Sequence, residues 1–214
     1  HDTADHELSF SEGCIWFSEA LLPSQFLPRF RGDRLSESWT HADGIIGHFR
    51  IGRGGKADTT VLPDAKHLVI TEAKMFSKLS AGVKNASYFN QGARYVACMA
   101  ELLSRAERKP ADLTRLGLYV LAPAEAIGDA VFDTHLDKED IRQMVEQRVQ
   151  VYDGDKDRWF EEWFMPVLEQ SDIKPISWES IIDFIKVTDL HFANSLQDFY
   201  AKCVKYNRPA YYRG

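Results

Sequence analysis

The chain has 214 residues and a formal net charge of −6 at pH 7, with 44% hydrophobic and 27% charged residues. These values are typical of one globular domain, with room for a small second lobe, and they exclude disordered, collagen-like and disulfide-scaffold proteins. No apolar run approaches the roughly 18 residues of a membrane helix, and the acidic N-terminal residues do not resemble a signal peptide. Three widely spaced cysteines without a CxxC pair favour a reduced, cytoplasmic compartment. We therefore expect no membrane partner.

The negative charge is concentrated in one block. Residues 124–172 hold 14 acids and 5 bases, whereas residues 29–115 hold 15 bases and 9 acids. The overall sign of the charge therefore does not exclude a polyanionic partner. The acidic block is most simply a solvated helical face, and a shielding role or a partner contact stays open.

The first half of the chain predicts one helix followed by three strands. A helix is expected over 9–22, because apolar residues recur at helical spacing before Pro23. Runs rich in β-forming residues predict strands over 44–51, 57–62 and 67–74, separated by a Gly-rich turn and by Pro63-Asp64. These turns make the three strands antiparallel neighbours.

The second half is mostly helical. A long helix is expected over 80–108, ended by Pro110, and a short strand over 116–122. Further segments are helices over 138–150, 156–169 and 190–206, with an extended stretch over 173–178. The long helix has the length of a parallel crossover. The sequence thus predicts an α/β fold with a central mixed sheet, made of a core over 1–123 and a C-terminal helical extension over 124–214 packed on it.

Polar residues gather at one predicted edge of the sheet. Asp58 opens the second strand, and Glu72 and Lys74 end the third strand with their side chains on the same face. Antiparallel pairing would bring these three residues together. Gln91 and Tyr95 are four residues apart on the following helix and share one face.

These groups suit hydrolysis of a phosphate ester. Two carboxylates form a site for Mg²⁺ or Mn²⁺, and the carbonyl oxygen of Ala73 is a candidate third ligand. A bound metal lowers the pKa of water and polarises a phosphoryl oxygen. A lysine beside it, Lys74, can offset developing negative charge or orient an attacking water.

The pattern resembles the PD-(D/E)xK nuclease superfamily. The matching segments are Lys56-Ala-Asp58, Leu68-Val-Ile-Thr-Glu72-Ala-Lys74 and Gln91-Gly-Ala-Arg-Tyr95. The last segment is similar to the QxxxY helix motif of the RecB-like and lambda-exonuclease-like branch. The resemblance covers about residues 9–122, and Ala57 stands where the superfamily's proline would be.

The resemblance implies a restriction-endonuclease-like core of αβββαβ order with an added C-terminal helical region. It implies Asp58 and Glu72 as ligands of Mg²⁺ or Mn²⁺, Lys74 as the catalytic lysine and Gln91 close to the active site, with Tyr95 supporting the helix. Glu19, or else Glu12, is the candidate for a further acid from the first helix.

Nucleic acid is the expected partner, with DNA favoured. Arg53, Lys56 and Lys78 are candidate phosphate contacts in the basic region. At the C-terminal end, cations alternate with tyrosines, a pattern that suits backbone phosphates and stacked bases but also a helix whose tyrosines pack on the body. A homodimer or a protein partner stays open, as do roles in phage defence, DNA repair and mobile-element processing.

Structural explanations compete with each functional one. Glu72 and Lys74 could form an ordinary ion pair at a strand end, Asp58 could be a turn residue, and Gln91 and Tyr95 could lie on a helix face. The functional interpretation depends on their joint order. A second hypothesis is a non-catalytic nuclease-fold module that binds nucleic acid or protein, and a third is an unrelated α/β enzyme acting on a small phosphorylated substrate.

Overall fold

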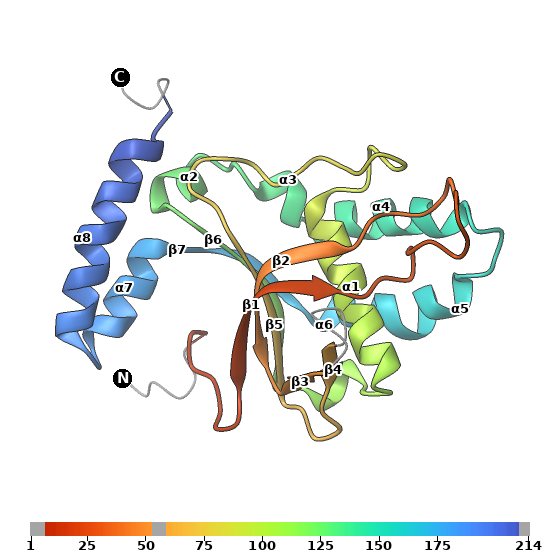
Figure 1. Ribbon diagram of the computed structural model, residues 1–214, viewed down its shortest axis with the longest axis horizontal. Coiled ribbons are helices and arrows are strands. Elements are labelled where there is room, and N and C mark those ends of the chain that lie inside the picture. Colours follow the sequence, from red (N-terminus) through yellow and green to blue (C-terminus); the bar gives the residue numbers. More distant parts are fainter. Residues whose placement is uncertain (1–6, 53–58, 210–214) are drawn as a thin grey trace.

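A computed structural model describes residues 7–52 and 59–209 (Figure 1). The strands are β1 (Ile15–Leu22), β2 (Thr40–Gly47), β3 (Phe49–Ile51), β4 (Thr59–Val61), β5 (His67–Ala73), β6 (Arg115–Ala122) and β7 (Asp172–Ser177). The helices are α1 (Gln91–Arg105), α2 (Ala124–Gly128), α3 (Asp133–Leu136), α4 (Lys138–Gln150), α5 (Asp157–Trp159), α6 (Met165–Gln170), α7 (Trp178–Lys186) and α8 (Leu190–Asn207). A 3₁₀ turn covers Pro110–Asp112, and a π-helical turn, Phe160–Phe164, joins α5 to α6.

The described residues form a five-stranded mixed sheet in the order β1-β2-β5-β6-β7, and β3 and β4 form a separate hairpin. β1, β2 and β5 are antiparallel neighbours in that order, whereas β5, β6 and β7 run parallel. Helix α1 connects β5 to β6 and makes the predicted parallel crossover. The α/β class and the mixed central sheet are therefore confirmed.

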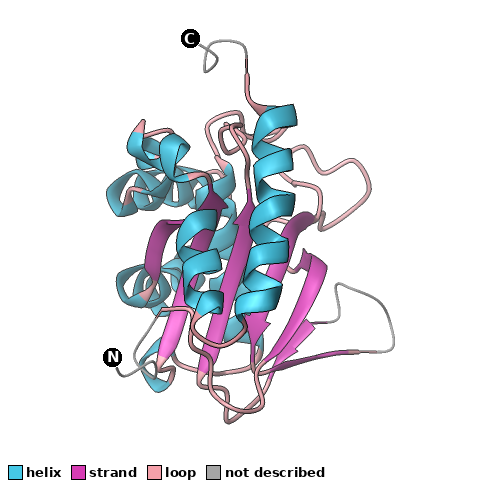
Figure 2. Ribbon diagram, turned by 90° about the vertical axis from the view of Figure 1, so that its left-hand side faces the viewer, coloured by secondary structure: helices cyan, strands magenta, loops and turns pink. Residues whose placement is uncertain are grey.

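Helices cover both faces of this sheet. Leu68 and Ile70 of β5 pack in the large core that includes α1, whereas Val69 packs with Tyr119 and Ile176 in a smaller core on the other face. A strand buried on both faces explains why β5 reads as a continuous apolar run. Figure 2 shows α7 and α8 side by side across that second face. Within 7–52 and 59–209, every helix is too short or too polar to span a bilayer.

The predicted first helix over 9–22 is wrong. Residues Ile15–Leu22 form β1, which pairs with β2 along its length at the edge of the sheet. A short run of apolar residues cannot be assigned to helix or strand by spacing alone. Here Ile15, Trp16 and Phe17 favour a strand, and pairing with β2 decides the outcome.

The predicted order of the three strands is also partly wrong. The run over 44–51 is divided at Gly47 and His48 into β2 and β3. β4 pairs with β3 and not with β5, so the antiparallel neighbour of β5 is β2. The strands expected over 67–74 and 116–122 are confirmed as β5 and β6.

The long helix is shorter than the prediction of 80–108. Helix α1 begins at Gln91, because the side chain of Asn90 accepts a hydrogen bond from the Ala93 amide and caps the helix. The C-terminal helices over 138–150 and 190–206 are confirmed, and the stretch over 173–178 is β7. Helix α7 was not predicted. Ser177 caps it, and its apolar face packs toward the sheet and α8.

Candidate active site

Glu72 and Lys74 lie together at the end of β5. Glu72 is 4% exposed, and the Lys74 ammonium group donates a hydrogen bond to its Oε1 over 2.6 Å. The two side chains share a face because they are two residues apart in extended chain. Their expected placement on one face is confirmed, and the ion pair between them is largely shielded from water, unlike an ordinary ion pair at a strand end.

Gln91 and Tyr95 bring the first turns of α1 onto the same carboxylate. The Gln91 side-chain amide donates to Glu72 Oε1 and to the Tyr95 hydroxyl, each over 2.8 Å. The Tyr95 hydroxyl contacts the other oxygen of Glu72 and lies 2.9 Å from the carbonyl oxygen of His41. Both oxygens of Glu72 are therefore held by side chains, and the shared face expected from the four-residue spacing on α1 is confirmed.

The Tyr95 hydroxyl stays protonated in this setting. Burial raises the pKa of Tyr95 far above its usual value, and the negative charges of Glu72 and Asp43 raise it further. A protonated hydroxyl can donate its hydrogen to the Glu72 carboxylate or to the His41 carbonyl. Tyr95 thus fixes the orientation of Glu72 and joins α1 to the start of β2.

A second carboxylate, Asp43, completes this group and was missed in the sequence. Gly44 of β2 pairs with Thr71 of β5, so the antiparallel register sets Asp43 opposite Glu72. Its Oδ2 accepts a hydrogen bond from the Ala73 amide over 2.7 Å. Residues directly opposite each other on antiparallel strands project to the same face. We call Asp43, Glu72, Lys74, Gln91 and Tyr95 the carboxylate cluster.

Asp58, the expected partner of Glu72, lies outside the described residues, as do Arg53 and Lys56. Asp58 is expected beside Glu72 only if the strand over 57–62 pairs with β5. The described part of that strand, β4, pairs with β3 instead. A signal for Asp43 was present in the sequence. It immediately precedes the apolar strand residues Gly44-Ile-Ile. A strand over these residues that pairs antiparallel with β5, with Gly44 opposite Thr71, sets Asp43 opposite Glu72.

Glu19 lies on β1 and not on a helix. Ser18 pairs with Gly44 and Ala20 with Ala42, so Glu19 falls opposite Asp43. Its backbone has a φ of 53°, in the left-handed region that is uncommon for residues with a side chain. Its side chain is exposed, as is that of the second choice, Glu12. Glu19 therefore lies at the edge of the cluster because β1 pairs with β2, and not because a first helix carries it there.

The remaining nucleic-acid candidates lie at two separate places in the chain, the segment after β5 and the C-terminal end. Lys78 is exposed in the segment between β5 and α1. At the C-terminal end, the Tyr200 hydroxyl donates to Glu179 over 2.7 Å, and Arg208 forms an ion pair with Glu125. Lys205 and Tyr206 are exposed on α8. Part of this basic and aromatic segment therefore packs on the body, and part faces outward.

The donor set of the carboxylate cluster fits a small hard cation. Asp43 and Glu72 would hold Mg²⁺ or Mn²⁺, and the Ala73 carbonyl lies between the two motif residues of β5. In the described part of the chain, no group of three or more His, Cys, Asp or Glu side chains is placed to hold a metal. Two carboxylates are nevertheless a usual number for Mg²⁺, which keeps several waters and takes further oxygens from substrate phosphates.

The C-terminal half of the chain touches this site through α7. The indole N–H of Trp178, the first residue of α7, donates to the carbonyl oxygen of Lys74 over 3.1 Å. The carboxylate of Glu179 accepts from the Ala124 amide at the exit of β6 over 3.0 Å. Helix α7 therefore supports the backbone that follows Glu72 through the Lys74 carbonyl.

A second polar group lies at the opposite end of the β2 and β5 pair. His48 Nδ1 accepts hydrogen bonds from the amides of Lys66 and His67, over 3.3 Å and 3.2 Å, and its Nε2 lies 3.2 Å from the Glu12 carbonyl oxygen. These partners assign the proton to Nε2. The Cys14 sulfur is 3.6 Å and 3.7 Å from the two ring nitrogens. We call Ser11, Cys14, His48 and His67 the histidine cluster.

The histidine cluster has the properties of a structural group. The nitrogen of His48 that could act as a base already accepts two backbone amides, and the sulfur of Cys14 lies about equally far from both ring nitrogens. Burial raises the pKa of the Cys14 thiol, which disfavours the reactive thiolate.

Comparison with known proteins adds no relative: no protein-family model matches the chain, and no curated protein or solved structure matches it significantly.

Proposed function

We propose that this protein is a divalent-metal-dependent nuclease with a restriction-endonuclease-like core, which hydrolyses phosphodiester bonds, with DNA as the favoured substrate. One arrangement carries the proposal. The buried Glu72 carboxylate is hydrogen-bonded by Lys74, Gln91 and Tyr95, and the strand register sets Asp43 opposite it. A carboxylate pair, a lysine and a helix bearing Gln and Tyr are the parts that the PD-(D/E)xK resemblance requires.

Each residue of the cluster has a chemical role in this proposal. Asp43 and Glu72 would hold the cation, which when bound supplies Lewis acidity for phosphoryl oxygens and water. Lys74 has its ammonium group beside Glu72, so its charge can offset the negative charge that develops on the phosphate. In the reaction, the oxygen of water forms a bond to phosphorus and the bond to the leaving sugar oxygen breaks.

Gln91 and Tyr95 are positioning residues. Their hydrogen bonds hold the Glu72 carboxylate in one orientation, so that its ligand oxygen does not rotate away. Groups that orient a metal-binding carboxylate typically affect metal affinity or activity about 10- to 100-fold when removed.

The proposal is tested by cleavage of supercoiled and linear DNA with Mg²⁺, with Mn²⁺ and with EDTA. Lys74→Ala removes the ammonium group from the site. Lys66→Ala is the matched control, because Lys66 is an exposed lysine just before the other end of β5. We expect cutting that requires metal, is lost in Lys74→Ala and is retained in Lys66→Ala. Cutting that Lys74→Ala leaves unchanged would overturn the assignment.

The alternative function is a nuclease fold that binds without cutting. Binding of labelled DNA in EDTA, with no cleavage under either metal, would favour it. Cleavage of a small phosphate ester but not of DNA or RNA would instead favour an enzyme acting on a small substrate.

A further inference from the structure

The connection between β1 and β2 is a long loop beside the candidate site. Leu22 and Thr40, the residues at its two ends, pair with each other, and Asp43 follows three residues later on β2. We call residues 23–39 the β1–β2 loop. The Asn85 side chain, from the segment that leads into α1, donates to the Ser36 carbonyl oxygen of this loop over 2.7 Å. The loop therefore borders the edge of the sheet that carries the carboxylate cluster.

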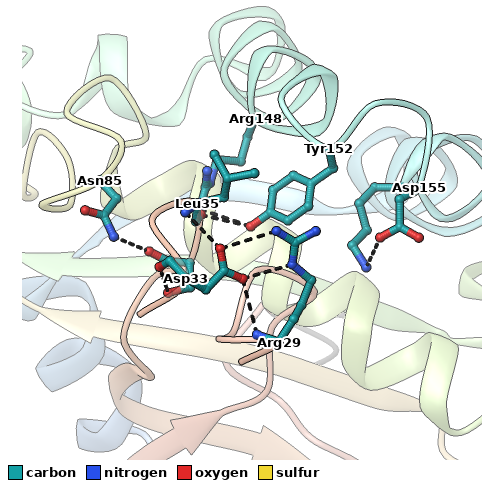
Figure 3. A network of polar contacts seen from close by, with 9 residues as sticks. Arg29, Asp33, Leu35, Asn85, Arg148, Tyr152 and Asp155 are labelled. Atoms are coloured by element: carbon teal, nitrogen blue, oxygen red, sulfur yellow. Dashed lines mark hydrogen bonds and ion pairs between the residues drawn. The ribbon is translucent and has the colours of Figure 1, made fainter. Parts of the chain in front are cut away.

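The inner side of this loop is tightly bonded to α4 and to itself (Figure 3). Asp33 is 6% exposed and accepts hydrogen bonds from the Arg29 side chain over 2.9 Å and from the Leu35 amide over 3.0 Å. The hydrogen bonds from Arg29 hold the pKa of Asp33 well below its usual value. The carbonyl oxygen of Leu35 accepts from the Tyr152 hydroxyl over 2.9 Å and from Arg148.

A chain of alternating rings and guanidinium groups runs from the core to the surface of the loop. The Arg148 guanidinium lies 5.1 Å from the ring centre of Phe26 and 5.4 Å from that of Tyr152. The Arg29 guanidinium lies 4.8 Å from the Tyr152 ring and 5.7 Å from the Phe30 ring. Phe26 is fully buried, whereas Phe30 at the outer end is 62% exposed. An exposed aromatic ring is thus backed by ordered neighbours.

The outward side of the loop is cationic. Arg31 and Arg34 are exposed, and the ion pairs found within 7–52 and 59–209 include neither of them. The nearby carboxylate of Asp33 is neutralised by Arg29, and that of Asp155 pairs with Lys156 over 3.1 Å (Figure 3). Within the loop itself, the exposed charge that ion pairs leave uncompensated is therefore that of Arg31 and Arg34, which complements a polyanion.

We propose that the β1–β2 loop binds a single strand of nucleic acid, with a base stacked on Phe30 and phosphates at Arg31 and Arg34. This inference rests on the proposed nuclease function and assigns to it a surface that holds substrate at the rim of the site. A base has an aromatic face that stacks on any exposed ring, and arginines neutralise phosphates without regard to sequence. The Arg29 guanidinium already lies beside the Phe30 ring, so one side of the ring has a neighbour before the strand binds.

The test measures binding of a fluorescein-labelled single-stranded DNA of about 20 nucleotides, longer than the site of one binding fold, by fluorescence anisotropy in EDTA to prevent cleavage. The variants are Phe30→Ala and the pair Arg31→Ala with Arg34→Ala. The matched controls are Phe192→Ala, an exposed aromatic residue on α8, and Lys66→Ala, an exposed cation just before β5. Melting curves of all variants verify that each is folded.

We expect Phe30→Ala to weaken binding about 5- to 100-fold. The arginine variant should reduce the slope of log affinity against log salt by about 0.7 for each phosphate that the protein no longer neutralises. Neither control should differ from the wild type. Unchanged binding and salt dependence in the loop variants would overturn this inference while leaving the nuclease proposal intact.

Other outcomes separate this inference from the proposed function. Lys74→Ala should lose cleavage yet bind the strand as the wild type does. If the wild type binds no DNA or RNA strand, both proposals fail. If the loop variants lose affinity for an acidic polypeptide such as polyglutamate but not for the strand, the surface docks an acidic protein and the nucleic-acid assignment is overturned.

Discussion

The two ends of the β2 and β5 strand pair carry polar clusters of contrasting character. In the carboxylate cluster, Lys74, Gln91 and Tyr95 all bond to the Glu72 carboxylate, and the strand register sets Asp43 opposite Glu72. In the histidine cluster, the His48 ring bonds to backbone amides and a backbone carbonyl. Side chains that satisfy the backbone stabilise a turn, whereas side chains that hold each other's charges can exchange those partners for a ligand. This contrast separates the candidate active end of the strand pair from a structural one.

The largest expected effect comes from the two carboxylates. Asp43→Asn and Glu72→Gln should each reduce metal-dependent cleavage at least about 100-fold, because each removes a charged metal ligand. The measurement is the initial rate of DNA cutting over a range of Mg²⁺ concentrations. Asp64→Asn, at an exposed turn near the histidine cluster, is the control.

Asp58→Asn sharpens the same experiment, because the sequence alone favours Asp58 and the strand register favours Asp43. Full activity in Asp58→Asn together with loss in Asp43→Asn is the expected pair of results. The reverse pattern would contradict the assignment of Asp43.

A smaller effect is expected for Tyr95→Phe. The hydroxyl contacts both Glu72 and the His41 carbonyl, and removing it frees the carboxylate to rotate. Cleavage should fall about 10-fold to 100-fold, and half-maximal activity should require more Mg²⁺. An equal loss at all metal concentrations would argue against a role in orienting the metal ligand.

At the structural end, His48→Ala should act on stability and not on chemistry. The substitution leaves the amides of Lys66 and His67 without their acceptor, which costs about 1–3 kcal/mol of the free energy of unfolding. Urea denaturation measures this loss. The cleavage rate of the folded fraction should equal that of the wild type, and a selective loss of cleavage would remove the contrast between the two ends.

The smallest effect is a change with pH. Burial lowers the pKa of His67, and the charges of Arg115 and His48 lower it further. The folded protein therefore binds a proton at His67 less tightly than the unfolded chain does. This contribution to stability is complete above the unfolded pKa of about 6.5. It is lost as the pH falls from that value through the lower pKa of His67 in the folded protein. His67→Gln, measured by urea denaturation between about pH 5 and 8, should show a flatter dependence than the wild type.

Much of this architecture follows from local sequence signals. β5 is a continuous apolar run that ends in Glu72 and Lys74, and β6 and α4 have clear periodicity and end signals, so their positions are predictable. The shared face of Gln91 and Tyr95 also follows from helix spacing, whereas their closeness to Glu72 is implied only by the nuclease resemblance.

The rest depends on pairing between distant segments. β1 reads as a helix until β2 is available to pair with it, and the choice between Asp43 and Asp58 depends on which strand lies beside β5. The predicted strand over 44–51 is divided at Gly47 and His48, so that β3 leaves the main sheet and pairs with β4. Spacing along the chain does not contain this information, because two hairpin turns are compatible with either neighbour.

The hydrogen bond between Trp178 and the Lys74 carbonyl has a consequence for when the candidate site folds during synthesis of the chain. The two residues are 104 positions apart. At translation rates of about 5–20 residues per second, Trp178 is added roughly 5–20 s after Lys74. Strand β7, which completes the parallel side of the sheet, is also made late. The end of β5 thus waits for its support until most of the chain has left the ribosome, and the candidate site is among the last parts of the molecule to reach its final form.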